Sequence, residues 1–263
     1  MNRSKVLIAA VAIAGAAALV EATSRVSVYS FDLPVILLLA AGAGVAQRVP
    51  VFLFRSSAVS VAYAATIATF VLYGTGVALW VNLASAAVNA FTPRRKPVEK
   101  ILFNTGALTV SAYLAGSVFE LLGGHSASRD PGTTVLAVAG SSLVYFAMNS
   151  TLTASIIALT SQTGALRNAL AVWRENYSWM TVNYVVTASA GAGLALAYEA
   201  IEVVGIAIFI LPIAAGWATF RAYMVNSAGA RKRTEELERT NQRLLQSNEA
   251  MTLALERLGV FKP

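Results

Sequence analysis

The sequence contains no cysteine and a single histidine among its 263 residues. Without cysteine there are no disulfide bridges, thiolate nucleophiles or thiolate metal sites. The one histidine, His125, lies in the segment GGHSASRDPG. Zinc sites and nucleophiles that depend on a histidine pair or a Cys–His pair are therefore excluded as well. We predict no catalytic residue, no metal site and no cofactor in this chain.

Charged residues are also scarce. They make up 13% of the chain, while apolar residues make up 57%, and soluble domains typically carry about 25% charged residues. The apolar residues form blocks of roughly 15 to 25 residues, close to the length that crosses a hydrocarbon core as a helix. These blocks lack the strict alternation of barrel strands. The composition therefore predicts an integral membrane protein built from helices.

The expected fold is all-α: a polytopic transmembrane bundle of about eight spans, followed by a C-terminal cytoplasmic coiled-coil helix. Residues 1–226 form the transmembrane domain and residues 227–263 the cytoplasmic signalling helix. The second span is short, and only Gly74 separates the third from the fourth, so six or seven full crossings remain an alternative. The expected spans are 5–22, 33–47, 56–73, 75–91, 99–122, 134–161, 178–200 and 204–225.

The distribution of the net charge of +7 predicts the orientation, because Lys and Arg in short loops prefer the cytoplasmic side. With the N-terminus inside, only Arg25 and Arg129 fall in outer loops. Both termini are then cytoplasmic, and we expect the bacterial inner membrane, with lipid and no nucleic acid as partner. The inner segments carry Arg3, Lys5, Arg48, Arg55, Arg94, Arg95, Lys96, Lys100, Arg167 and Arg174.

The segment TGALRNALAVWRENYSW, between the sixth and seventh expected spans, has apolar residues at helical spacing. Leu166, Leu170, Trp173 and Tyr177 share one face, and polar residues occupy the others. This pattern is typical of an amphipathic helix in the membrane interface. An ordinary connecting loop with aromatic anchors is the alternative.

Five asparagines lie within or near the ends of the expected spans: Asn82, Asn89, Asn104, Asn149 and Asn183. An amide in lipid without a hydrogen-bond partner costs several kcal/mol, so these side chains should face the bundle interior. One interpretation is hydrogen bonding between helices. The other is that Asn104, Asn149 and Asn183 line a pocket for a small polar or amphipathic ligand, with Glu120 contributing charge near the outer end.

The C-terminal stretch from Arg231 to Leu258 is the one long segment that is wholly water-soluble in character. Counting in sevens gives one core position occupied by leucine and methionine and a second occupied by Thr234, Asn241, Asn248 and Leu255. Asparagine at such a position sets register at a cost in stability, so we predict a weak homodimer, with a solvated monomeric helix as the alternative. The dimerisation residues are Leu237, Asn241, Leu244, Asn248, Met251 and Leu258.

Several short segments occur in an order that resembles a known family. They are RRKP at 94–97, Phe103–Asn104, Asn149–Ser150, WREN at 173–176 and FRAYM at 220–224. Together they resemble the multi-pass N-terminal membrane domain of bacterial HD-GYP phosphodiesterases and GGDEF cyclases, over roughly residues 33–226. The resemblance implies a membrane sensor whose signalling helix controls an enzyme of cyclic-di-GMP metabolism.

No HD dyad, Gly-Tyr-Pro or GGDEF segment follows Leu258, so no catalytic residue carries over from the family. The chain is expected to signal to a cytoplasmic partner or to be the membrane part of a protein with an output domain. We predict a membrane sensory domain that binds a small ligand or senses the membrane and relays its state through a dimeric helix. The alternatives are a small-solute transporter or substrate-binding membrane subunit, and a scaffold that recruits partners through its tail.

Overall fold

A computed structural model describes residues 3–26, 32–48, 51–54, 57–59, 62–92, 94–124, 131–161 and 166–257. His125, Arg55, Arg129 and Leu258 lie outside these residues. The chain divides into two compact units, Met1–Phe209 and Ile210–Pro263, each described by itself. The division after residue 226 stays a prediction.

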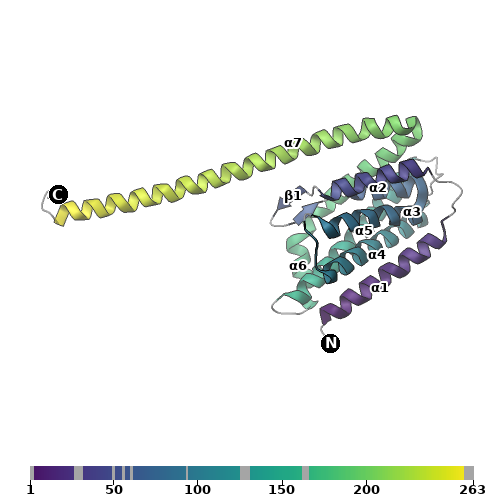
Figure 1. Ribbon diagram of the computed structural model, residues 1–263, viewed down its shortest axis with the longest axis horizontal. Helices are drawn as coiled ribbons and strands as arrows, with labels where there is room; N and C mark the ends of the chain where they lie inside the picture. Colours follow the sequence, from purple (N-terminus) through teal and green to yellow (C-terminus); the bar gives the residue numbers. More distant parts are fainter. Residues whose placement is uncertain are drawn as a thin grey trace. The chain divides into compact units, whose positions relative to one another are not determined.

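The described residues are almost entirely helical (Figure 1), so the all-α prediction is confirmed at this level. Helices are favoured because lipid offers the backbone no hydrogen-bond partners. A short antiparallel hairpin, β1 (Val51–Phe54) and β2 (Ser57–Val59), precedes α3. The α-helices are α1 (Arg3–Ser24), α2 (Leu33–Arg48), α3 (Ala62–Phe91), α4 (Val98–Leu121), α5 (Pro131–Thr160), α6 (Ala169–Asn176) and α7 (Thr181–Arg257).

Local sequence explains several helix ends. The Asp32 carboxylate accepts a hydrogen bond from the backbone N–H of Val35 at 3.4 Å and so caps α2. Pro97 precedes α4, and Glu99 in its first turn suits the positive end of the helix dipole. Gly123, with φ of 82°, follows the end of α4, where a left-handed residue is favoured.

The prediction of eight spans is wrong. Among the described residues, five segments are long and apolar enough to cross a membrane. The second expected span, α2, has 16 residues and is too short for this criterion. Most of the third expected span and all of the fourth fall within α3, and most of the seventh and all of the eighth fall within α7. The five candidate spans are Arg3–Ser24, Ala62–Phe91, Val98–Leu121, Gly132–Thr160 and Tyr184–Ile208.

The helix α3 is broken at Gly74, whose φ of 76° and ψ of −178° are not helical. Tyr63 packs against Tyr145 with ring centroids 4.2 Å apart, and Asn82 accepts a hydrogen bond from the same Tyr145. In an unbroken helix Tyr63 and Asn82 would be about 28 Å apart. The two halves of α3 therefore fold back on each other. Because residues 57–59 belong to β2, the first half, from 62 to 73, is only about 18 Å long.

The helix α7 is also interrupted, at Ile201 and at Glu202, which has a φ of 54°. A Cβ atom on Gly205 would clash with the Ala197 carbonyl. Residues eight apart would be about 12 Å apart in a continuous helix, so the chain turns back sharply at this break. The Tyr198 hydroxyl, one turn before it, donates to Asp32 at 2.6 Å.

The segment that was predicted to be amphipathic is helical. It comprises η2 (Leu166–Asn168), α6 and η3 (Ser178–Met180). Leu166 and Leu170 are exposed, at 53% and 61%, while Trp173 is half-buried. Its location in the membrane interface stays a prediction.

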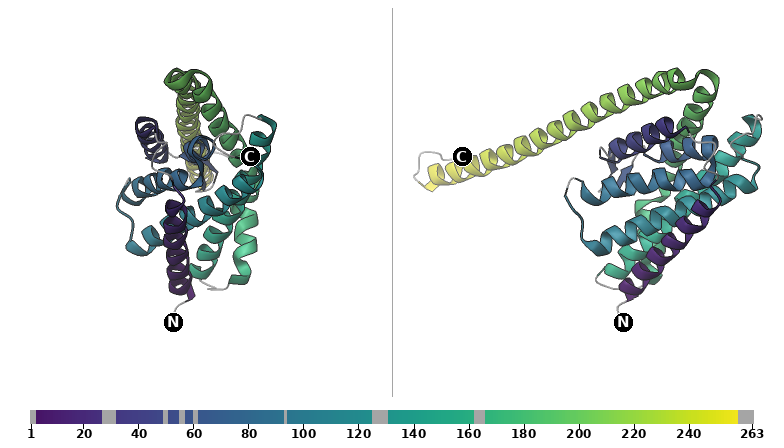
Figure 2. Two further views of the ribbon diagram at one scale, coloured as in Figure 1. Left: turned by 90° about the vertical axis from the view of Figure 1, so that its right-hand side faces the viewer. Right: turned by 45° about the vertical axis from the view of Figure 1, so that its right-hand side comes forward.

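Small residues allow the helices of the first unit to pack closely (Figure 2), with α1 against α4 and α2 against α3. Gly15 and Gly106 meet at the α1–α4 crossing, where a Cβ atom on Gly106 would lie 2.6 Å from the Val11 carbonyl oxygen. Larger side chains fill the centre of the bundle, where the rings of Phe70 and Phe119 stack with centroids 6.1 Å apart.

We expect Gly106→Ala to destabilise the protein by about 1–3 kcal/mol, because the added methyl group meets backbone that cannot give way. Gly42→Ala is the matched control, since nothing lies within 4 Å of its added Cβ and alanine is the better helix former by about 1 kcal/mol. Thermal unfolding in detergent measures the Tm of the two purified variants and of the parent. An unchanged Tm for Gly106→Ala would contradict this packing.

Candidate functional site

A polar cavity of about 200 Å³ lies inside the first unit. Its lining comes from α2, both halves of α3, α4, α5 and the start of α7. Amides, hydroxyls and tyrosine rings dominate this lining. The lining residues are Gln47, Ala62, Tyr63, Asn82, Ser85, Asn89, Asn104, Ala107, Leu108, Tyr145, Asn149, Thr153 and Tyr184.

Asn82 joins three helices beside the cavity. Its side chain is 4% exposed, and its Nδ2 donates to the Leu108 carbonyl on α4 at 3.0 Å. Its Oδ1 accepts from the Tyr145 hydroxyl on α5 at 3.4 Å. Asn82 is therefore a structural amide whose hydrogen bonds are used within the protein.

Asn149 and Asn104 differ from Asn82 in how they are bonded. Asn149 Nδ2 donates to the Tyr184 hydroxyl at 3.3 Å, which links α5 to α7. The Asn104 side chain lines the cavity without a hydrogen-bond partner among the described residues. The Asn104 amide thus keeps both donor and acceptor capacity toward the cavity.

Three tyrosine rings form one wall of the cavity. The Tyr63 centroid lies 4.2 Å from that of Tyr145 and 5.6 Å from that of Tyr184. The Tyr63 hydroxyl is buried and has no hydrogen-bond partner in the described structure. A buried hydroxyl left unpaired costs about 1–3 kcal/mol.

The fold-back of α3 is what brings these groups together. It places Tyr63, from the start of α3, beside Asn82 and Ser85 of its second half. Gly191 lies against the Ala64 carbonyl and the Ile67 side chain, so α7 approaches the first half of α3 closely. That approach sets Tyr184 against Tyr63.

No Asp, Glu, Lys, Arg or His is among the described residues that line the cavity. Lys96, in the connection between α3 and α4, donates from Nζ to Asn89 Oδ1 at 2.5 Å without lining the cavity itself. Burial lowers the pKa of the Lys96 ammonium, and the neighbouring charge of Lys100 lowers it further. The interior of the cavity is therefore polar but uncharged.

The half-buried Trp173 connects α6 to the side of the cavity. Its Nε1 donates to the Ser150 hydroxyl at 2.7 Å, and its ring lies 6.0 Å from that of Phe146. The ring centroid of Phe146 in turn lies 5.1 Å from that of Tyr184. Burial raises the pKa of the nearby Tyr177 hydroxyl.

Two of the four predicted ligand residues, Asn104 and Asn149, line the cavity. Asn183 belongs to α7 next to Tyr184, but its side chain lies outside the described part of the structure. Glu120 is elsewhere: its Oε1 accepts from the Thr75 hydroxyl at 2.5 Å. Glu120 lies sixteen residues beyond Asn104 on α4, about 24 Å along the helix. Ligand binding by these residues stays a prediction.

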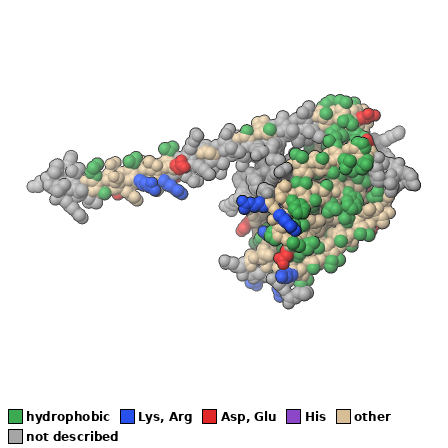
Figure 3. Space-filling view, viewed as in Figure 1, with side chains coloured by type: hydrophobic (Ala, Val, Ile, Leu, Met, Phe, Trp, Pro, Cys, Tyr) green, Lys and Arg blue, Asp and Glu red, His purple; other side chains and the backbone are tan. Residues whose placement is uncertain are grey.

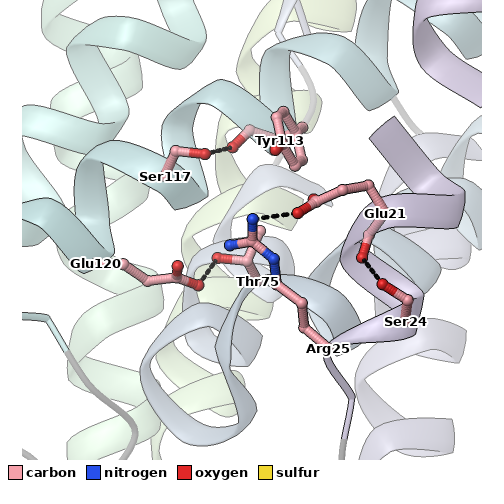
Figure 4. Close-up of polar contacts among 7 residues, drawn as sticks. All are labelled: Glu21, Ser24, Arg25, Thr75, Tyr113, Ser117 and Glu120. Carbon is pink, nitrogen blue, oxygen red and sulfur yellow. Dashed lines mark hydrogen bonds and ion pairs between the residues drawn. The ribbon is translucent and has the colours of Figure 1, made fainter. Parts of the chain in front are cut away.

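Glu120 belongs to a second polar cluster at the other end of α4 (Figure 4). Thr75 directly follows the break in α3, so its bond to Glu120 ties that break to α4. Nearby, Glu21 and Arg25 of the α1 end form an ion pair. These contacts hold the helix ends together, and this cluster contributes nothing to the cavity lining.

The tyrosines were the residues that the sequence interpretation missed. Tyr63, Tyr145 and Tyr184 each lie within an apolar segment, where a hydroxyl needs a partner as an amide does. The same rule that selected the asparagines would have selected these tyrosines. The contribution of Gln47 could not have been found, because it depends on how α2 packs against α3.

A family model named MASE9 matches residues 65–220. The match begins in the first half of α3 and includes α4, α5, α6 and the start of α7. No curated protein and no solved structure gives a significant match.

We expect Asn82→Leu to lower stability by about 1 kcal/mol, because it removes two interhelical hydrogen bonds worth about 0.6 kcal/mol each. Asn104→Leu should leave stability unchanged or raise it, since the Asn104 amide has no partner among the described residues. Unfolding of the two variants in the same detergent tests the difference. Equal losses would show that Asn82 and Asn104 play the same structural role.

Proposed function

We propose that this chain, which belongs to the MASE9 family of multi-pass, membrane-associated sensor domains, binds a small ligand in its polar cavity and relays the bound state through α7. The observation that carries this proposal is the cavity itself. Polar groups with unused hydrogen-bonding capacity are costly inside a membrane bundle unless something occupies them. The open Asn104 amide and the unpaired Tyr63 hydroxyl are such groups.

Contacts at the start of α7 support the proposed relay. Tyr184 lines the cavity and bonds to Asn149, and α7 extends from Thr181 to Arg257. A ligand that favours one packing of Tyr184 also favours one position of the helix that carries it. The ligand shifts the equilibrium by its difference in affinity for the two states.

The cavity supports a sensor better than a transporter. Transporter sites are typically formed where discontinuous helices break near the membrane midplane. The breaks in this chain are at Gly74 and at Ile201–Glu202. No residue next to either break lines the cavity. A substrate in this cavity would therefore not be held by the parts of the helices that most readily change conformation.

The proposed topology has both termini in the cytoplasm. The α2 end, both ends of α3, the first turns of α4 and the start of α7 meet at the cavity, and Lys5 pairs with Glu99 at 3.7 Å. Lys and Arg gather toward one end of the visible face of the first unit (Figure 3), which supports a cytoplasmic orientation for that end. The chain after Glu202 must then cross back.

Reporter fusions test this topology. A fusion after Arg95, Arg174 or Pro263 should report the cytoplasm, because the basic connections are retained there. A fusion after Ser128 should report the external side and serves as the opposite control. An external signal at Pro263 would contradict the return crossing and the cytoplasmic tail.

The proposed output is a cytoplasmic partner or output domain of the HD-GYP or GGDEF type, controlled through a homodimeric tail. The core positions that the tail would use in pairing are exposed in the single chain: Leu237 is 70%, Leu244 58% and Met251 59% exposed. Their seven-residue spacing supports pairing with a second copy. Asn241 and Asn248 at the other core position favour a weak pair that can switch.

Cysteine crosslinking in membranes tests both the tail and its coupling to the cavity. Leu244→Cys and Met251→Cys should each crosslink between chains, since facing core positions lie within disulfide reach. Gln242→Cys should crosslink poorly. The chain has no native cysteine, so the background is clean.

Adding Asn104→Trp fills the cavity and takes the place of a ligand, so it should change the crosslinking yield at Met251→Cys. The matched control is Leu102→Trp, on the same helix but 48% exposed, which should leave the yield unchanged. Crosslinking only at Gln242 would contradict the pairing surface. A yield unaffected by Asn104→Trp would contradict the relay.

A further inference from the structure

We infer that the ligand of this cavity is an uncharged aromatic molecule of one or two rings that carries a carbonyl oxygen. The Tyr63 hydroxyl and the Asn104 amide would be the groups that bind that oxygen. This inference rests on the proposed ligand-binding function and adds the chemical class of the ligand. Four features of the cavity lead to it: its lack of charge, its size, its unpaired donors and its tyrosine wall.

The described lining residues offer no counter-charge to a charged ligand. None of the thirteen lining residues is acidic, basic or histidine. A buried ion without a counter-charge carries a large desolvation penalty. Lys96 is not among the described lining residues, and its ammonium is bonded to the Asn89 side chain. The described lining therefore favours a neutral ligand.

The size of the cavity limits the ligand to a small ring system. An apolar protein cavity of about 150 Å³ accommodates benzene. The present cavity, at about 200 Å³, matches a molecule of one or two rings. Longer lipid chains and nucleotides exceed this volume, so only part of such a molecule would fit inside.

The unpaired polar groups favour a hydrogen-bond acceptor in the ligand. Tyr63 is 6% exposed, and its hydroxyl has no partner in the described structure. This hydroxyl can donate a hydrogen bond, and the open Asn104 amide can donate a second one. A carbonyl oxygen, with two lone pairs, can accept both.

The tyrosine wall favours an aromatic ligand and leaves no cation site between its rings. The centroids of Tyr63, Tyr145 and Tyr184 lie 4.2, 5.6 and 6.0 Å apart. Rings this close contact one another and leave no space for an ammonium group between their faces. Their free edges and faces present an apolar aromatic surface on which another ring can pack in an offset or edge-to-face arrangement.

The test uses the full chain in lipid nanodiscs with menadione as the probe, a neutral two-ring quinone. Methylnaphthalene has the same ring system without carbonyl oxygens, and a naphthoquinone sulfonate adds a negative charge. The dependence of Tm on probe concentration gives relative affinities. Menadione should bind on the order of tenfold more tightly than methylnaphthalene, as two hydrogen bonds predict. The sulfonate should not shift Tm.

Tyr63→Phe isolates the hydroxyl. It should weaken menadione binding about three- to tenfold and leave methylnaphthalene binding unchanged. The Tm of the free protein should be equal or higher, because an unpaired buried hydroxyl is removed. Thr66→Val is the matched control. The Thr66 hydroxyl is also buried and unpaired in the described structure, on the same half of α3, but it does not line the cavity. Binding of both probes to this variant should equal that of the parent.

Three results would overturn the inference. These are equal affinity for menadione and methylnaphthalene, tighter binding of the sulfonate, or menadione binding that Tyr63→Phe leaves unchanged, which would mean that the hydroxyl does not bind the probe. If no probe binds while Asn104→Trp still alters crosslinking of the tail, the ligand class is wrong and the sensor function stands. If no probe binds and Asn104→Trp also leaves crosslinking unchanged, both the ligand class and the proposed sensor function are wrong.

Discussion

The reversal of α3 at Gly74 is the constraint on which the interior of this bundle depends. With φ at 76°, the residue adopts a conformation that glycine accepts readily and other residues rarely do. The following residue, Thr75, is fixed to Glu120 of α4, so the position of the turn is set by a second helix. Only because the chain turns back here do Tyr63 and Asn82 reach the same tyrosine.

Lipid then determines which polar groups this arrangement can contain. A polar group inside a membrane bundle needs hydrogen-bond partners in the protein. Asn82 has them, since its Nδ2 donates to one neighbouring helix and its Oδ1 accepts from another. Asn104 and the Tyr63 hydroxyl have no such partner among the described residues. Burying the Tyr63 hydroxyl without a compensating hydrogen bond costs stability. Asn82 and Asn104 thus differ in their hydrogen bonding within the described structure.

The sequence predicted the class of fold and the location of most helices, because apolar length and the absence of charge carry that information directly. It also led to Asn104 and Asn149 as interior residues. The predicted number of spans was wrong, since hydropathy does not distinguish a helix that crosses from one that turns back, as α3 does at Gly74. Glu120 was grouped with the asparagines by residue type, although its partner, Thr75, depends on the α3–α4 packing.

The relay proposed for α7 would have to pass the break at Ile201 and Glu202. A rigid helix would transmit a displacement of Tyr184 unchanged, whereas a helix with a sharp turn transmits it only if the turn is held in place. The Tyr198 hydroxyl, bonded to Asp32 at 2.6 Å, anchors the segment before the turn to the start of α2. Asp32 also caps α2, so a movement of α7 at this point is coupled to the end of another helix. One short helical segment, from Thr181 to just before the break, has the cavity at one end and the turn at the other. A rotation or translation of this segment would move both ends together.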